Sequence, residues 1–173
     1  MESVQSACEQ ARQRIDDDAP LDEILNGLVN AAETIAGDGS VASVLILDDD
    51  GLLRNGASPN LPRHYLEAID GIRPHPAVGT CAAAAATGEI VVTPNFLDDR
   101  KWVELRHLPI AIGFIGAWSM PIKTVDGRVL GTFGTYYRDI REPSDVERAA
   151  LRQLAAVAAA ALEHARREVP GVA

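Results

Sequence analysis

Apolar positions recur along the chain with two different periods, and the period distinguishes predicted helices from predicted strands. Near the C-terminus, a Ser144-x-x-Glu147 capping box precedes a long stretch with one broad apolar stripe, which predicts a helix over 144–168. The same helical spacing over 20–36 predicts a second long helix, and residues 2–15 are helix-prone with weaker amphipathicity. Both ends of the chain are therefore expected to be helical.

Stretches rich in β-branched residues lie between these helices, and Asp-Gly turns join two pairs of them as hairpins. The expected strands, in chain order, are 41–47, 52–57, 89–93, 114–122 and 128–137, and the expected short helices are 62–70, 79–87 and 102–108. Short connections and Asp-Gly turns favour an antiparallel sheet, with the terminal helices covering one face. The predicted fold class is therefore α+β.

The short helix over 79–87 is the segment best suited to meet a ligand. Gly79 and Thr80 open it, Gly88 stands where a glycine would close it, and five alanines occupy its middle. Its slim start would offer the backbone N–H groups of Thr80, Cys81 and Ala82 to a guest. A small anion there would gain roughly 0.3–1 kcal/mol from the helix dipole. The alternative is that Thr80 only caps a structural helix.

Composition limits the functional classes. The chain has 173 residues, which suits one domain, and its net charge of -9 argues against direct nucleic-acid binding. No apolar run approaches the length of a membrane span, and two lone cysteines, Cys8 and Cys81, fit a reducing cytoplasm. We expect an N-terminal helical extension over 1–19, the domain over 20–168 and a tail over 169–173.

Several segments resemble the GAF domain family in their order and spacing, over roughly residues 20 to 165. They are Val78-Gly79-Thr80-Cys81 with the alanine helix, Thr87 to Val92, Asp98 to Trp102, Ala117 to Ile122 and Asp126 to Phe133. The chain departs from the usual pattern at Ala82, where glycine is common, and at Ile112-Gly113, where a His-Gly pair often stands. The resemblance implies an antiparallel sheet of about six strands. One face would carry a ligand pocket with short helices, and the other would carry the terminal helices.

The resemblance also implies a function. Such domains are sensory modules of bacterial signal transduction that bind a small molecule and act on a partner kinase or regulator, here without enzymatic activity. Standalone nitrate-receptor proteins of this kind make nitrate, or another small anion, the most concrete ligand, held at Gly79, Thr80, Cys81 and Ala82. No cofactor is specified. We expect ligand binding to order the 71–80 loop and shift the population of signalling states.

The terminal helices are expected to form a homodimer interface. The helix over 144–168 is apolar around most of its girth, so it must be covered on most sides. We expect a two-fold homodimer through 20–36 and 144–168, with Ala158→Glu disrupting it.

Three further residues are candidates for the ligand site. Strand alternation places Trp118 and Met120 on one face, and the buried indole N–H could meet a ligand oxygen, with core packing as the alternative. Ser119 adjoins Trp118, and Tyr136 could close a pocket. A ligand-free dimerisation module is favoured if side chains such as Trp118 and Tyr136 fill that pocket.

Enzymatic chemistry has one candidate residue. Cys81, at a helix start, could act as in GAF-type free methionine sulfoxide reductases, but Cys8 lies outside the matched region. None of the four histidines, His64, His75, His107 and His164, is expected to share a predicted element with another ligand at zinc-binding spacing. No metal site is therefore expected.

Overall fold

The computed structural model describes residues 3–37 and 39–168, and its central element is a five-stranded antiparallel sheet in the order β2-β1-β5-β4-β3. The strands are β1 (Val41–Leu47), β2 (Leu53–Ala57), β3 (Val91–Thr93), β4 (Gly116–Lys123) and β5 (Val129–Tyr137). The helices are α1 (Val4–Asp16), α2 (Leu21–Ala36), α3 (Arg63–Ile69), α4 (Cys81–Thr87), α5 (His107–Ala111) and α6 (Asp145–Arg167), with single 3-10 turns η1 (Phe96–Asp98) and η2 (Arg100–Trp102). The predicted α+β class is confirmed, with a strand count close to the six expected.

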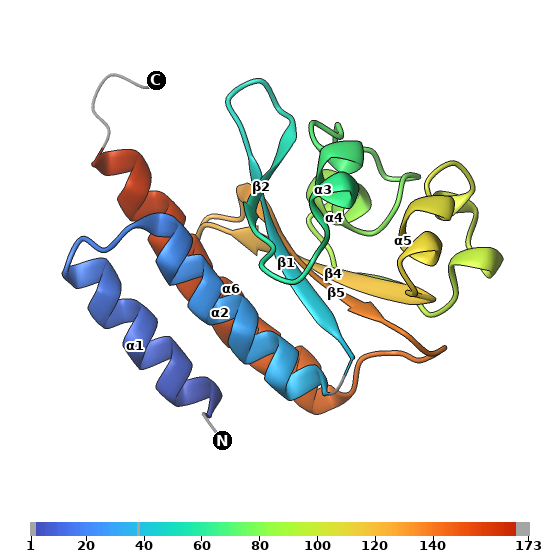
Figure 1. Ribbon diagram of the computed structural model, residues 1–173. Coiled ribbons are helices and arrows are strands. Elements are labelled where there is room, and N and C mark those ends of the chain that lie inside the picture. The colour runs from blue at the N-terminus through green and yellow to red at the C-terminus, as the bar shows by residue number, and fades with distance from the viewer. Residues whose placement is uncertain (1–2, 38, 169–173) are drawn as a thin grey trace.

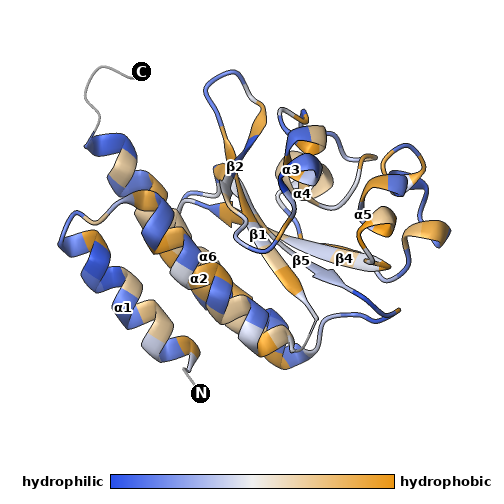
Figure 2. Ribbon diagram, in the orientation of Figure 1, coloured by the Kyte–Doolittle hydropathy of each residue, from blue (hydrophilic) through white to orange (hydrophobic). Residues whose placement is uncertain are grey.

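The helices form two layers on opposite faces of the sheet (Figure 1). The long helices α2 and α6 lie side by side against one face, and α1 packs on their outer side. The short helices α3, α4 and α5 lie on the other face, and α4 rests on β4 and β5. Figure 2 shows that hydrophilic residues are frequent along α1, as expected for the outermost helix.

Alternation along the strands divides the interior into two apolar cores. On β5, Phe133 and Tyr137 point toward the long helices, whereas Tyr136 points toward the short ones. On β1, Val44 points toward the long helices and Leu45 points toward the short ones. The sheet therefore separates a core that holds the terminal helices together from a core that surrounds the short helices.

Helix α1 covers part of the girth of α6 within one molecule. Ala7, Cys8 and Ala11 are buried, and these small residues let α1 approach closely. Ala158 of α6 is 0% exposed in the same core. Ala158→Glu would bury a charge inside the monomer, so this substitution cannot test a dimer as the sequence suggested.

Two local predictions were wrong. The helix expected over 102–108 is instead the η2 turn followed by α5, and the side chain of Asp99 caps η2 by accepting from the Lys101 N–H. The strand expected over 114–122 is β4 from Gly116, so Phe114 precedes the strand, and it packs in the core of the short helices. The predicted tail over 169–173 lies outside the described residues.

Candidate functional site

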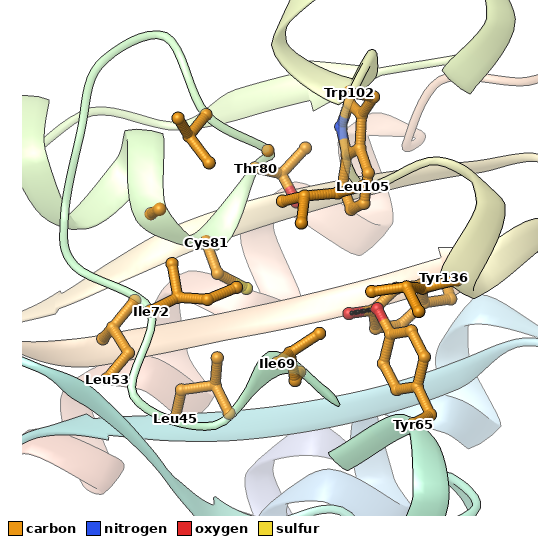
Figure 3. A pocket seen from close by; sticks show the side chains of 14 residues that line it. Leu45, Leu53, Tyr65, Ile69, Ile72, Thr80, Cys81, Trp102, Leu105 and Tyr136 are labelled. Atoms are coloured by element: carbon orange, nitrogen blue, oxygen red, sulfur yellow. Dashed lines mark hydrogen bonds between the residues drawn. The ribbon is translucent and has the colours of Figure 1, made fainter. Parts of the chain in front are cut away.

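A small cavity lies between the pocket face of the sheet, α3, α4 and the segment from η2 to α5 (Figure 3). The cavity has a volume of about 30 Å³, which is room for roughly two waters. Most of its lining is aliphatic or aromatic; the residues are Leu45, Leu53, Tyr65, Ile69, Ile72, Val78, Gly79, Thr80, Cys81, Ala82, Trp102, Leu105, Leu108 and Tyr136.

The alanine helix forms one wall because its small side chains allow close packing on the sheet. Ala82, Ala83 and Ala84 are buried, and Gly88 ends the helix in the left-handed conformation with φ 71°. Beneath α4, a Cβ atom added at Gly134 would lie 3.2 Å from the sulfur of Cys81. Glycine at this position of β5 therefore sets how closely α4 approaches the sheet.

A chain of hydroxyl and thiol groups ties the start of α4 to β4. The Ser119 hydroxyl donates to Thr80 Oγ1 over 2.9 Å and lies 3.0 Å from Cys81 Sγ. Since the single Ser119 hydrogen is used on Thr80, the Cys81 thiol donates to Ser119 Oγ. Thr80 makes no side-chain cap to its own helix, so its hydroxyl serves the contact with the strand.

The environment of Cys81 disfavours a thiolate. Burial raises the pKa of the Cys81 thiol, and the contact with the Ser119 hydroxyl offsets this only in part. A protonated thiol is a poor nucleophile and a poor metal ligand. Cys81 is therefore suited to lining the cavity rather than to redox chemistry.

Two tyrosines form the polar end of the cavity. The phenolic oxygens of Tyr65 on α3 and Tyr136 on β5 are 2.7 Å apart, and the rings meet edge to face at 89°. Burial raises the pKa of both phenols, so both stay protonated near neutral pH. One hydroxyl donates to the other, and the second hydroxyl hydrogen has no hydrogen-bond acceptor among residues 3–37 and 39–168. The pair can therefore donate one hydrogen bond to a guest.

Backbone and side-chain hydrogen bonds fix the cavity wall that is formed by η2 and the residues after it. The Gly79 N–H donates to the Lys101 carbonyl over 2.8 Å, which joins the loop before α4 to η2. The Trp102 indole N–H donates to Thr93 Oγ1 over 3.2 Å, and Thr93 donates to Asp99. These bonds hold the segment that supplies Trp102 and Leu105 against β3.

The structure brings together most of the residues expected at the site. Gly79, Thr80, Cys81, Ala82 and Tyr136 all line the cavity, and Ser119 lies just behind them, in contact with the start of α4.

Trp118 does not reach this cavity. Alternation along β4 turns Ala117 and Ser119 toward the short helices, so Trp118 and Met120 face α2 and α6. The Trp118 indole lies 6.0 Å from the guanidinium of Arg148, in the core of the helical face. Core packing, the alternative weighed for this residue, describes its surroundings.

Three residues that line the cavity, Tyr65, Trp102 and Leu105, were not expected there from the sequence. Tyr65 and Ile69 are four residues apart on the buried face of α3, so helical spacing could have indicated Tyr65. Trp102 and Leu105 belong to the segment predicted as a helix over 102–108, and nothing in the sequence places that segment over the cavity.

With this fold and cavity, comparison with known proteins identifies the family. The chain matches the GAF domain family over residues 18–163, and it therefore belongs to that family. It is 37% identical over 153 residues to the methyl sulfide methyltransferase-associated sensor of Methanosarcina acetivorans. That alignment covers 88% of this chain but 15% of the relative, so the chain spans a small part of the relative's length.

Solved structures show the same fold. The GAF domain of a phosphoenolpyruvate-protein phosphotransferase from Coxiella burnetii superimposes with a TM-score of 0.76 at 18% identity, covering 95% of each chain. Free methionine-R-sulfoxide reductase from Neisseria meningitidis, solved with its substrate, superimposes with a TM-score of 0.71 at 15% identity. The superposition covers 96% of this chain and 92% of the reductase chain. Within the described ranges, no helix is long and apolar enough to cross a membrane.

Proposed function

We propose that this GAF domain is a sensory module whose cavity binds a small, neutral, mostly apolar molecule carrying one hydrogen-bond acceptor. The observation that carries the proposal is the Tyr65–Tyr136 pair, which places a spare O–H donor at one end of an otherwise apolar space. A guest with an apolar body and one acceptor atom would satisfy both features. The cavity is narrow, so a guest larger than about two waters requires the walls to move.

A small anion such as nitrate, implied by the family resemblance, fits this lining less well. The cavity is lined by no Lys, Arg or His in the described part of the chain. An unpaired anion among aliphatic walls loses its hydration without compensation. The seven-residue α4 offers only a short array of backbone dipoles. We therefore favour a neutral guest and treat nitrate as a competing outcome.

Signalling would pass from the cavity to the terminal helices and then to a partner protein. Tyr136 lines the cavity, and its neighbour Tyr137 on β5 bonds to Glu147 at the start of α6. A guest that displaces Tyr136 would thus act on a strand bonded to the helical layer. A partner kinase or regulator, a homodimer through α2 and α6, and a cytoplasmic location belong to this proposal.

A non-enzymatic role is part of the proposal. Cys8 packs in the core of the long helices, whereas Cys81 lies beside the cavity on the other side of the sheet. A disulfide requires Cα atoms within about 7 Å, and the sheet lies between these two residues. Reductase chemistry that relies on a second thiol is therefore not supported by their placement.

A binding panel tests the proposal. Tag-free protein is titrated with dimethyl sulfide, dimethyl sulfoxide, acetone and sodium nitrate, and unfolding is followed by differential scanning fluorimetry with calorimetric confirmation. A guest at about one hundred times its Kd adds about 2.7 kcal/mol of stability. Stabilisation by a neutral acceptor-bearing compound, and not by nitrate, supports the proposal. Stabilisation by nitrate alone, or by none of the four, contradicts it.

A further inference from the structure

A second cluster of polar side chains lies on the helical side of the sheet, where the α1–α2 turn meets the end of α6. Asp18 from the turn, and His164 and Glu168 from the end of α6, each place one potential metal-ligand atom within 4.8 Å of the others. The imidazole Nε2 of His164 is 2.8 Å from Asp18 Oδ1. None of the three lines the ligand cavity, so this cluster is separate from the proposed guest site.

The geometry suits a shared cation. His164 and Glu168 are four residues apart at the end of one helix, so their side chains project on the same side. Ligand atoms about 2.0–2.2 Å from a tetrahedral zinc ion are roughly 3.3 Å apart. The His164–Asp18 separation is already close to that value, and the exposed Glu168 side chain can close the remaining distance by changing rotamer.

Electrostatics also favours a cation here. The C-terminal end of α6 carries the negative pole of the helix dipole, and two carboxylates face one imidazole. The nearby Arg166 is directed elsewhere, since its guanidinium donates to the Leu47 carbonyl over 3.1 Å. A divalent ion would neutralise charge in a protein whose net charge is -9.

We propose that Asp18, His164 and Glu168 bind a first-row divalent transition ion, Zn²⁺ in the first instance, with water completing the coordination. One imidazole nitrogen among the donors favours Zn²⁺ over Mg²⁺ and Ca²⁺, which take oxygen ligands. The ion would fasten the α1–α2 turn to the end of α6 and so join the helices at the two ends of the chain. Metal binding would thus set how firmly α1 covers the helical layer.

Metal titration of the tag-free full chain tests this assignment. Calorimetry with Zn²⁺ should show one ion per chain, and Co²⁺ should give visible d–d absorption without a thiolate charge-transfer band. His164→Ala should weaken Zn²⁺ binding by at least about tenfold, since loss of even an outer-shell partner costs that much. Glu168→Gln should weaken it too, whereas the matched control Glu163→Gln, five residues earlier on α6, should leave it unchanged.

Several outcomes would overturn the assignment. They are Zn²⁺ affinity unchanged in His164→Ala, equal binding of Mg²⁺, a thiolate band that points to Cys8 or Cys81, and no heat of binding. Circular dichroism of each metal-free variant confirms that it folds. Asp18→Asn removes a proposed ligand without changing any helix, so it provides a second test should His164→Ala fail to fold, and it should also weaken Zn²⁺ binding.

Discussion

The phenolic oxygens of Tyr65 and Tyr136 lie 2.7 Å apart at one end of the cavity, although 71 residues separate them in the chain. The contact joins α3 to the centre of the sheet, and it supplies the polar end of a space lined mostly by Leu, Ile, Val and Trp side chains. The proposed binding of a guest with one acceptor atom depends on this pair.

Removing one hydroxyl should destabilise the protein and reveal the coupling between the two. Tyr65→Phe or Tyr136→Phe leaves the other hydroxyl buried without a partner, which costs about 1–3 kcal/mol. The double variant should lose less stability than the sum of the two single losses, because no hydroxyl is then left without its partner. Urea unfolding of the four proteins measures the cycle, and additive losses would show that the 2.7 Å contact carries no coupling.

Gly134 should be needed for the docking of α4. Gly134→Ala places a Cβ 3.2 Å from Cys81 Sγ and 3.3 Å from Ser119 Oγ, so these two side chains, which are bonded to each other between α4 and β4, must give by a few tenths of an ångström. We expect a loss of about 1–3 kcal/mol from overpacking, together with weaker guest binding.

Gly27→Ala is the matched control for this substitution. Gly27 lies within α2, and an added Cβ there meets only the flexible end of the Arg14 side chain. The same chemical change should stabilise by up to about 1 kcal/mol. Equal losses from both glycine substitutions in thermal unfolding would argue against close packing of α4 as the cause.

Glu147 should make the free energy of unfolding fall as the solution is acidified. Burial by itself raises the pKa of this carboxyl, but hydrogen bonds from Tyr137 and Ser144 and the charge of Arg141 lower it below its ordinary value of 4.5 overall. A lowered folded-state pKa contributes stability above that ordinary value, and the contribution is lost as the pH falls through the folded-state pKa. Wild-type stability should therefore decline on acidification below about pH 4.5.

Glu147→Gln isolates this contribution. The variant should lose about 1–3 kcal/mol at neutral pH, because the bonds from Tyr137 and Arg141 no longer end on a charge. Its stability should then fall less steeply on acidification than that of wild type. Urea midpoints measured from pH 7 to pH 3 check this, and parallel curves would show that other carboxylates dominate.

The expected homodimer through α2 and α6 stays a prediction and needs a substitution outside the monomer core. Ala156 of α6 is exposed, whereas Ala158 is buried. Ala156→Glu should convert a dimer to a monomer in light scattering without lowering the unfolding temperature. A wild-type monomer, or a dimer unaffected by Ala156→Glu, would exclude this face of α6.

Local chemistry explains which parts of the structure could be predicted. The Ser144–Glu147 capping box forms as expected, and the Asp126-Gly127 turn joins β4 to β5. Gly88 closes α4 with positive φ. Each of these signals acts over a few residues, so the sequence pattern contains all the information that specifies it.

The cavity lining and the cluster of Asp18, His164 and Glu168 depend on contacts between distant segments. Tyr65 and Leu105 reach the cavity only because α3 and the segment after η2 fold over the same sheet face. Asp18 and His164 are 146 residues apart, and the four-residue spacing of His164 and Glu168 gains meaning only beside Asp18. Tertiary packing, which no local period encodes, creates both arrangements.

The most direct test of guest binding compares two Leu→Trp substitutions, one at a residue that lines the cavity and one at a residue outside it. Leu105→Trp places an indole in the cavity, whereas Leu97 of η1 does not line it and is 62% exposed, so Leu97→Trp leaves the cavity open. Both variants are titrated by calorimetry with dimethyl sulfide, dimethyl sulfoxide, acetone and nitrate. We expect Leu97→Trp to bind a neutral guest as wild type does, and Leu105→Trp to bind it at least about tenfold more weakly, or by about 1.4 kcal/mol. Equal affinity of that guest for both variants would contradict this expectation.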